Sequence, residues 1–329
     1  MATLREAIRT VSADRSTRTI QTMIQIESVA TVSPSFRRVT AVGDGLAAYT
    51  DPMPADAFRL FPAPAGLPGD GSGGAETSRA FTVRTFDPAA NRLTFDVHVH
   101  DGGLAGRWLD GLGGGESVRI IGMRVEFVPG ADGDGTAHLN GDAGVGDADV
   151  GDAGVGDAGV GASEGQRAAG AGRSGGGTDG ETGPLILAAD LSGLPAVAAI
   201  LAALPSARPA IAVISGAAAG DRPLLPARPG DDVRWVPAGG LVDAVRALPR
   251  PGNAATAWIG AEASEVRQIR RVVLGELGVR RPQLRAAAYW KRGASFDEMD
   301  ADTTRRYTEA VAAGRDITDP AVLEDLGLG

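Results

Sequence analysis

The chain has 329 residues, 43% of them hydrophobic, which is enough apolar material for two domains with a core each. The net charge of −9 argues against a nucleic acid or an anionic membrane as partner, and the absence of cysteine excludes disulfides, iron–sulfur clusters and thiolate zinc sites. The first 25 residues contain no apolar run typical of a secretory signal, and no run elsewhere would span a bilayer, so we expect a cytoplasmic protein.

The N-terminal part of the chain is predicted to be rich in strands. Residues 1–22 are polar and predict a short helix or a loose arm. Residues 23–129 contain short strand-like segments separated by turn signals, without helical periodicity. Strands at this spacing are typical of an antiparallel barrel or sandwich. The exception is the segment LAGRWLDGL, which begins at Leu104 and predicts a helix of one or two turns.

Two neighbouring segments of this part have the chemistry of a binding site. The segment RAFTVR alternates, so Arg79 and Phe81 face one side of a strand while Thr82 and Arg84 face the other. Residues 92–100, RLTFDVHVH, predict the returning strand, and a glycine-rich bend follows it. Arginine, an aromatic ring and a hydroxyl, next to backbone N–H groups freed by a bend, suit a flat ring that carries a diphosphate. The two segments together predict a flavin site.

The middle of the chain, residues 130–183, has a different composition. Between Gly141 and Val160 a pentapeptide recurs as GDAGV, GDADV, GDAGV and GDAGV, surrounded by Gly, Ala, Asp and Ser. Such a segment buries too little apolar surface to offset its chain entropy, so we predict a disordered linker or loop insertion. The regular aspartates raise a calcium-binding repeat as the alternative, but calcium solenoids have a nonapeptide period and a bulky residue in each turn.

From residue 184 the pattern changes to alternating strands and helices. The predicted strands are PLILAAD, PAIAVISG, VRWVPA, TAWIGAE and RAAAYW, and the predicted helices are LSGLPAVAAILAAL, LVDAVRAL and SEVRQIRRVVLGELG. Strands that alternate with helices indicate a parallel sheet with crossover connections. This α/β domain is expected to end at residue 295. Residues 296–329 predict an acidic, partly helical tail.

An antiparallel barrel followed by a parallel α/β domain is the layout of flavin reductases of the ferredoxin-reductase type. Within that group the sequence resembles the siderophore-interacting protein family, which are flavin-dependent ferric-siderophore reductases. The matching stretches, in the family's order, are RAFTVR, FDPAANRLTFDVHVHDGGLAGRW, LILAADLSGLPAVAAIL, WIGAEASEVRQIRRVV and AYWKRG. The resemblance implies an antiparallel Greek-key β-barrel that binds FAD over residues 23–129 and a Rossmann-like NAD(P)H domain with a parallel sheet over residues 184–295.

The resemblance assigns the flavin strand to Arg79, Phe81 and Thr82, where the family has Arg-x-Tyr-Ser/Thr. The aromatic ring would pack on the isoalloxazine, the hydroxyl would bond near its redox edge, and the arginine would meet the diphosphate. Phe81 departs from the usual tyrosine and therefore lacks one hydrogen-bonding group. An ordinary amphipathic strand is the alternative interpretation of these residues.

The glycine-rich bend matches a second flavin element, His-Gly-Asp-Gly-Pro-Ala-Ser in the family and HDGGLAG in this chain. Glycine lets the backbone approach a pyrophosphate at a helix N-terminus. Leu104 replaces the proline and Gly106 the serine, which predicts weaker flavin binding. The cofactor-binding residues implied here are His98, His100, Gly103, Leu104, Ala105, Gly106 and Trp108. His98 and His100 alternate on one strand face and would suit a metal, but no third ligand is apparent and we predict none.

The segment LILAADLSGLPAVAAIL resembles the family's nicotinamide motif, Ala-Gly-Asp-Glu-Thr-Ala-Leu-Pro-Ala. It places Asp190, Ser192 and Leu194 at the carboxyl end of a strand, where α/β sheets bind ligands. Ala189 and Leu191 depart from the usual glycine and glutamate. These departures leave the strength and preference of nucleotide binding open.

The last two predicted strands add further candidates. Glu262 lies where the family has a glutamate near the nicotinamide, and Trp258 on the same strand is either near that site or in the core. Trp290, in AYWKRG, would cover the second face of the flavin. The family uses basic residues to attract anionic ferric siderophores, which in this chain implies Arg59, Arg107 and Lys291, with Arg292 in reserve.

The resemblance therefore implies an FAD-dependent NAD(P)H:ferric-siderophore oxidoreductase, with NADPH favoured over NADH. Reduction would release the iron because Fe(II) binds hard oxygen ligands more weakly than Fe(III). No catalytic acid or base is assigned, since the redox chemistry belongs to the cofactor. The expected partner is a ferric siderophore, without nucleic acid or membrane, and we expect a monomer. Two alternatives stay open: a flavin or electron-transfer reductase for another acceptor, and a catalytically degenerate protein that binds siderophores.

Overall fold

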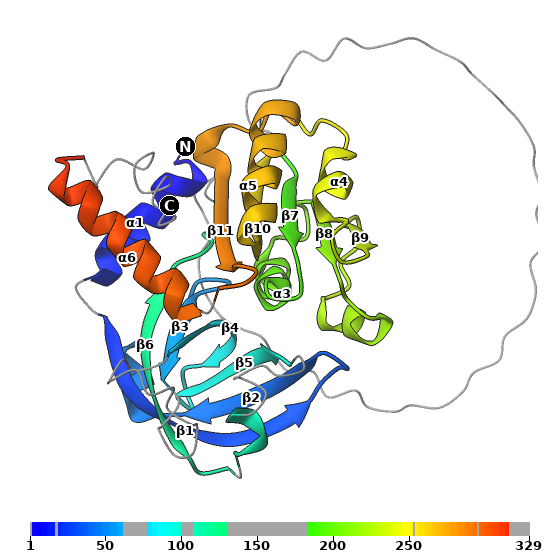
Figure 1. Cartoon of the computed structure of the whole chain (residues 1–329). Coiled ribbons are helices and arrows are strands. Elements are labelled where there is room, and N and C mark those ends of the chain that lie inside the picture. The colour runs from blue at the N-terminus through cyan, green and yellow to red at the C-terminus, as the bar shows by residue number, and fades with distance from the viewer. Residues whose placement is uncertain are drawn as a thin grey trace, which may run out of the picture.

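The computed structural model contains two domains and a helix that contacts both. It describes residues 2–16, 19–61, 78–99, 108–112, 114–130, 183–252, 254–294 and 296–315. Apart from its two end residues, the predicted linker lies outside this described part. Figure 1 shows the barrel below the α/β domain, with the arrowhead of β11 pointing toward the barrel. None of the described helices is long and apolar enough to cross a bilayer.

The N-terminal domain is a closed antiparallel barrel with the strand order β1-β2-β5-β4-β3-β6. Its strands are β1 (Ile20–Thr31), β2 (Phe36–Val42), β3 (Ala57–Phe61), β4 (Arg79–Asp87), β5 (Arg92–His98) and β6 (Ser117–Arg124), with a 3-10 helix η1 (Asp44–Ala48) after β2. Alternate apolar residues such as Val39, Leu60, Phe95 and Ile120 point inward and form one core. β1 pairs with β2 and with β6, which closes the sheet and confirms the barrel over the sandwich.

The C-terminal domain is a parallel five-stranded sheet with the order β11-β10-β7-β8-β9. Its elements are β7 (Leu185–Ala189), α3 (Leu194–Ala203), β8 (Ala210–Ser215), η2 (Ala219–Leu224), β9 (Asp232–Val236), α4 (Leu241–Arg246), β10 (Thr256–Glu262), α5 (Ala263–Arg271), the π-helical turn η3 (Val272–Glu276), η4 (Arg281–Gln283) and β11 (Leu284–Trp290). The strand order reverses between β7 and β10. Ligands bind α/β sheets at the carboxyl ends of strands beside such a reversal.

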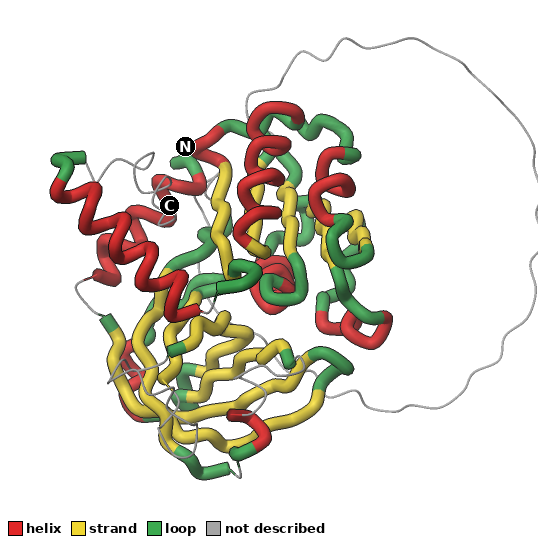
Figure 2. The backbone as a smooth tube through the Cα atoms, viewed as in Figure 1, coloured by secondary structure: helices red, strands yellow, loops and turns green. Residues whose placement is uncertain are grey.

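Both faces of this sheet are covered, as Figure 2 shows. One core contains α3 and the other contains α4 and α5. Strand β7 reads LILAA and is buried at every position, the continuous apolar run expected of a central parallel strand. Phe36 and Phe127 from the N-terminal domain join the α3 core, so this core extends across both domains. A last helix, α6 (Phe296–Ala312), follows the sheet.

Helix α1 (Leu4–Ser16) contacts both domains. At its start the backbone N of Leu4 donates to Gln283 Oε1 at 3.0 Å, and Leu4 is buried in the α3 core. At its other end Arg15 forms an ion pair of 2.7 Å with Asp56 of the barrel. The segment predicted as a helix or a loose arm is therefore a helix that links the barrel to the α/β domain.

Candidate functional site

The carboxyl ends of β7, β10 and β11 meet in a hydrogen-bonded cluster centred on Asp190. Its Oδ2 atom accepts hydrogen bonds from Trp290 Nε1 at 2.7 Å and from the backbone N of Glu262 at 3.0 Å. Its Oδ1 atom accepts from the backbone N of Ser192 at 2.8 Å and from the Ser192 hydroxyl. The structure thus brings together Asp190, Ser192, Glu262 and Trp290, which the sequence placed in the nicotinamide site and on the flavin's second face.

Both oxygen atoms of the Glu262 carboxylate accept hydrogen bonds from other groups of the protein. Its Oε2 atom accepts from the backbone N of Ser264 at 2.6 Å and of Glu265 at 3.2 Å, which caps helix α5. Its Oε1 atom accepts from the backbone N of Arg292 at 3.2 Å. Burial alone would raise the pKa of Glu262, but the hydrogen bonds from Ser264, Arg292 and Glu265 outweigh it and lower the pKa. Glu262 is therefore an ionised internal cap.

Asp190 and Glu262 together position the turn that follows β11. Asp190 binds the Trp290 indole, and Glu262 binds the backbone of Arg292 two residues later. Lys291, between them, is exposed and forms a bridge with Ala294. The Trp290 side chain stays 40% exposed although its N–H is bonded. Both carboxylates thus orient protein groups at the edge of the sheet.

On the barrel side, β4 presents different residues to its two faces. The Phe81 ring lies inside the barrel mouth, 5.2 Å from Phe95 and 6.2 Å from Phe58 between ring centroids. Thr82 is buried on the opposite face. Arg84, on that same face, donates from Nη2 to the backbone oxygen of Leu224 in the α/β domain at 3.0 Å. The outer face of β4 therefore borders the seam between the domains.

Tyr289 of β11 faces Thr82 across this seam. Burial, followed by the negative charge of Glu126, raises the pKa of the Tyr289 hydroxyl, which lies beside Thr82. That hydroxyl is buried and forms no hydrogen bond of normal geometry within the described part of the chain. Tyr289 also lies in AYWKRG, where the predicted site residues were Trp290 and Lys291, with Arg292 in reserve. Because successive strand residues face opposite sides, alternation would have placed Tyr289 on the face opposite Trp290 and identified it as a second candidate.

The seam fits the redox edge of a flavin. A buried hydroxyl without a partner is unusual in proteins, because it loses its hydrogen bonds with water and gains none. Here the Tyr289 hydroxyl and the Thr82 hydroxyl lie together beside the strand that carries Phe81. The polar edge of an isoalloxazine would supply the missing partners. The fit rests on these residues, because the glycine-rich bend lies outside the described residues.

Three of the predicted site residues, two arginines and one histidine, contact other protein groups. Arg59 donates from Nη1 to Ser78 Oγ at 3.1 Å, and Arg79 donates from Nη1 to the Ser78 backbone oxygen at 2.6 Å. His98 lies with its ring tilted against Phe36, 5.4 Å between centroids. Arg59 and Arg79 therefore meet at the start of β4.

Three predicted residues contribute to cores. Trp108 packs partly buried against the barrel core, and Leu194 is fully buried at the start of α3. Trp258 is fully buried and edge-on to Tyr289 at 6.0 Å, so core packing is its role in this structure. The remaining predicted positions lie outside the described residues: His100, Gly103, Leu104, Ala105, Gly106 and Arg107.

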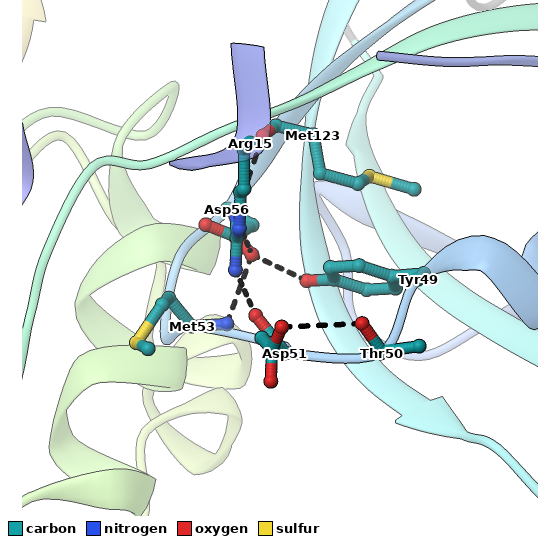
Figure 3. Close-up of polar contacts among 7 residues, drawn as sticks. All are labelled: Arg15, Tyr49, Thr50, Asp51, Met53, Asp56 and Met123. Carbon is teal, nitrogen blue, oxygen red and sulfur yellow. Dashed lines mark hydrogen bonds and ion pairs between the residues drawn. The ribbon is translucent and has the colours of Figure 1, made fainter. Parts of the chain in front are cut away.

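A buried carboxylate, Asp56, anchors α1 to the barrel, as Figure 3 shows. Its Oδ2 atom accepts from Arg15 Nη1 at 2.7 Å, the Tyr49 hydroxyl at 2.5 Å and the backbone N of Met53 at 2.9 Å. Burial raises the pKa of Asp56 to about 6, although Arg15 and the hydrogen bonds oppose the shift. Arg15 also donates to the backbone oxygens of Met123 and Asp51, beside a hollow of about 250 Å³.

A second buried carboxylate, Glu126, joins the barrel to the sheet. Its Oε2 atom lies 3.0 Å from both Nε and Nη2 of Arg285 in β11, and its Oε1 atom lies 2.6 Å from Nη2 of Arg124. Burial would raise the pKa of Glu126, but the positive charges of Arg124 and then Arg285 outweigh it and lower the pKa. This ion-paired cluster fixes the two domains next to Tyr289.

Two family models match the sequence. The model of the siderophore-interacting FAD-binding domain matches residues 25–127, and the model of the siderophore-interacting protein matches residues 183–293. Together the two matches cover more than half of the chain and correspond to the barrel and the α/β domain. A search among curated proteins finds no relative of this sequence.

Solved structures share the fold. The siderophore-interacting protein from Acinetobacter baumannii is 22% identical, with a TM-score of 0.67 over 89% of this chain and 99% of that one. The siderophore-interacting protein SipS from Aeromonas hydrophila is 21% identical, with a TM-score of 0.60 over the same shares. The ferredoxin reductase in carbazole 1,9a-dioxygenase is 16% identical, with a TM-score of 0.52 over 83% of this chain and 70% of that one. At these identities the likeness shows the fold.

Proposed function

The chain belongs to the siderophore-interacting protein family, and from this premise we propose that it is an FAD-dependent reductase that uses NAD(P)H to reduce ferric siderophores in the cytoplasm. The observation that carries the proposal is the seam between barrel and sheet. There the Thr82 hydroxyl of β4 and the Tyr289 hydroxyl of β11 lie together in a buried setting, and among the described residues the Tyr289 hydroxyl has no hydrogen bond of normal geometry. Such a pair suits the polar edge of a flavin ring.

Bound FAD would supply the exchange between a hydride donor, which gives electrons in pairs, and ferric iron, which accepts them singly. Thr82 and Tyr289 would offer hydrogen bonds to the ring edge, and Phe81 would offer an apolar ring face. Asp190 would keep the Trp290 indole fixed at the end of the sheet. Overall, one NAD(P)H reduces two ferric ions and releases one proton, and Fe(II) then leaves its oxygen ligands more readily.

Cationic side chains would attract the substrate. Lys291 is exposed on the turn held by Asp190 and Glu262, and Arg59 lies on the outer face of β3. The proposal includes Arg107, which the structure does not describe, as a third cation. On a chain with a net charge of −9, local positive charge would concentrate an anionic ferric siderophore at this position.

The direct test is to load the purified protein with FAD and follow the visible absorbance of bound flavin. Tyr289→Phe should weaken FAD binding by about 2–10-fold, because one neutral hydrogen bond is lost. It should change the free energy of unfolding of the FAD-free protein little, since this hydroxyl forms no hydrogen bond of normal geometry within the described residues. Tyr307→Phe, on exposed Tyr307 of α6, is the matched control and should change neither quantity.

The acceptor is tested by comparing NAD(P)H-driven reduction of a ferric siderophore, ferric citrate and a dye. Faster reduction of the siderophore supports the proposal. Equal rates for all acceptors would favour a general electron-transfer reductase, and siderophore binding without turnover would favour a degenerate binding protein. A colourless protein that does not take up added FAD would rule out the flavin function.

A further inference from the structure

The carboxyl ends of β8 and β9 lie on the other side of the strand-order reversal from Trp290. The residues that follow the two strands are small and uncharged: Ser215 to Ala218 read SGAA, and Val236 to Gly240 read VPAGG. Gly216 has φ of +80°, and a Cβ at that position would lie 3.7 Å from Ala238 and 4.0 Å from Leu191. The segments after β7, β8 and β9 therefore meet at one edge of the sheet.

One carboxylate at this edge, Asp221 of η2, is fully used in holding η2 to the barrel. It accepts from Ser33 Oγ at 2.7 Å, from Ser35 Oγ at 2.8 Å and from the backbone N of Ser35 at 3.1 Å, and it also accepts from the backbone N of Ala218 at 2.9 Å. Asp221 is fully buried. It therefore has no acceptor position left for a ligand, but it fixes the residue that follows it.

That residue is Arg222. Its guanidinium carbon lies over the Trp235 ring of β9, 5.6 Å from the centroid. The side chain is exposed and makes no hydrogen bond or ion pair within the described residues. At this distance the cation is attracted to the face of the indole, which favours positions of the guanidinium above the ring. Among the described residues, the edge of β8 and β9 thus presents one exposed cation beside a carboxylate, Asp221, that is already occupied.

In parallel α/β sheets, the strand after the first one distinguishes the two nicotinamide nucleotides. A carboxylate at its end binds the ribose 2′-hydroxyl of NADH, whereas an arginine accommodates the 2′-phosphate of NADPH. Here β8 is that strand, because it follows β7 in sequence and pairs with it. We propose that Arg222, stacked on Trp235, binds the 2′-phosphate of NADPH and makes the protein prefer NADPH over NADH. The inference rests on the proposed use of a nicotinamide nucleotide.

Binding can be measured without flavin or turnover, by calorimetry with adenosine 2′,5′-bisphosphate and adenosine 5′-monophosphate. The unmodified protein should bind the bisphosphate more tightly. Arg222→Met should weaken bisphosphate binding by about 10–100-fold, the effect of losing charge-assisted hydrogen bonds, and should leave monophosphate binding unchanged. Trp235→Leu should weaken bisphosphate binding by about 2–5-fold, because the guanidinium loses its platform.

Arg234→Met is the matched control. Arg234 neighbours Trp235 on β9, but its guanidinium is paired with Asp232 at 2.7 Å, so the variant makes the same charge change and should keep the preference. Equal binding of the two nucleotides, or a preference that survives Arg222→Met, would overturn the inference. Oxidation of NADH as fast as NADPH by the FAD-loaded protein would overturn it while the reductase function stands. Oxidation of neither nucleotide would remove both.

Discussion

Asp56 and Glu126 are both fully buried carboxylates that join separate parts of the molecule, yet their pKa values are shifted in opposite directions. Asp56 faces one guanidinium, Arg15, which also donates to two backbone oxygens. Glu126 lies between two guanidinium groups, Arg124 and Arg285. Burial raises the pKa of each carboxylate, and only the second positive charge overcomes it.

The opposite pKa shifts of Asp56 and Glu126 distinguish two contacts within the molecule. The Glu126 cluster connects the barrel to β11 beside Tyr289, so this contact between the domains is ionised throughout the neutral range. The Asp56 cluster connects α1 to the barrel, and Asp56 takes up a proton near pH 6. We therefore expect the domain seam and the α1 contact to respond differently to acid.

The sign of each response follows from linkage. The pKa of folded Asp56, about 6, lies above its ordinary value of 3.8, so its stabilising contribution is complete below 3.8 and is lost as the pH rises through 6. Glu126 has a lowered pKa when folded, so its contribution is present above the ordinary value of 4.5 and is lost as the pH falls through the lower, folded value.

The largest expected effect on the free energy of unfolding comes from removing Glu126, the carboxylate with two cationic partners. Glu126→Ala should lower the free energy of unfolding by about 3–5 kcal/mol, because Arg285, 12% exposed, would remain buried without its partner. Urea titrations at neutral pH measure this change. A loss below about 1 kcal/mol is typical of an exposed ion pair. It would contradict the conclusion that Glu126 is a buried carboxylate stabilised by two positive charges.

The next effect is the pH profile of Asp56. Between pH 7.5 and pH 4 its proton uptake should add at most roughly 3 kcal/mol to the free energy of unfolding, from a shift of about two pKa units. Asp56→Asn should remove this part of the profile. Asp51→Asn, an exposed neighbour in the same loop, should retain it. Identical profiles for the protein and Asp56→Asn would mean that Asp56 is already ionised well below pH 6.

The third prediction concerns Arg15→Met, which removes the cation that pairs with Asp56. The pKa of Asp56 should rise further, so the free energy of unfolding should fall by about 2–3 kcal/mol at pH 8 and by less at pH 5, where Asp56 is protonated in both proteins. Thermal unfolding at the two pH values tests the asymmetry. Equal losses at both would assign Arg15 a role only in its hydrogen bonds to backbone oxygens.

The smallest effect is expected for an exposed pair. Glu27 accepts from Arg92 Nε at 2.8 Å, but the two side chains are 36% and 43% exposed. Glu27→Gln should therefore leave the free energy of unfolding almost unchanged, and added salt should reduce even that small change. Urea titrations at low and high salt provide the measurement, and a salt-independent loss would argue that the pair is shielded from solvent.

Much of the fold could be predicted because its signals are local. Period-two alternation in RAFTVR and RLTFDVHVH indicated strands, and the change to helical periodicity after residue 184 indicated the parallel sheet. The resemblance assigned Asp190 and Ser192 to the nicotinamide motif and Glu262 to a position near the nicotinamide. The structure brings the three together, since the carboxyl ends of neighbouring parallel strands share one edge.

The hydrogen-bond partners of Asp190 and Glu262 could not be predicted from local sequence patterns. Asp190 and Glu262 look like open ligands in the sequence, but in the structure they bind Trp290, Arg292 and the start of α5. The Tyr289 hydroxyl lies beside Thr82 because β11 packs near β4, and this contact between distant strands is not visible in the local sequence. The sequence motif identifies the carboxylates at this edge, but some of their donors, such as Trp290 and the backbone of Arg292, come from a distant part of the chain.

The pattern of burial follows from the sequence alone, because the spacing of apolar residues sets which face of each strand or helix turns inward. The charge states and hydrogen-bond partners of Asp56, Glu126 and Tyr289 depend instead on the tertiary structure. Glu126 meets Arg285 across 159 positions of the chain, and Asp56 meets Arg15 across 41. A pKa depends on every charge and dipole within a few ångströms and on the exclusion of water, and both arise only once distant segments have packed together.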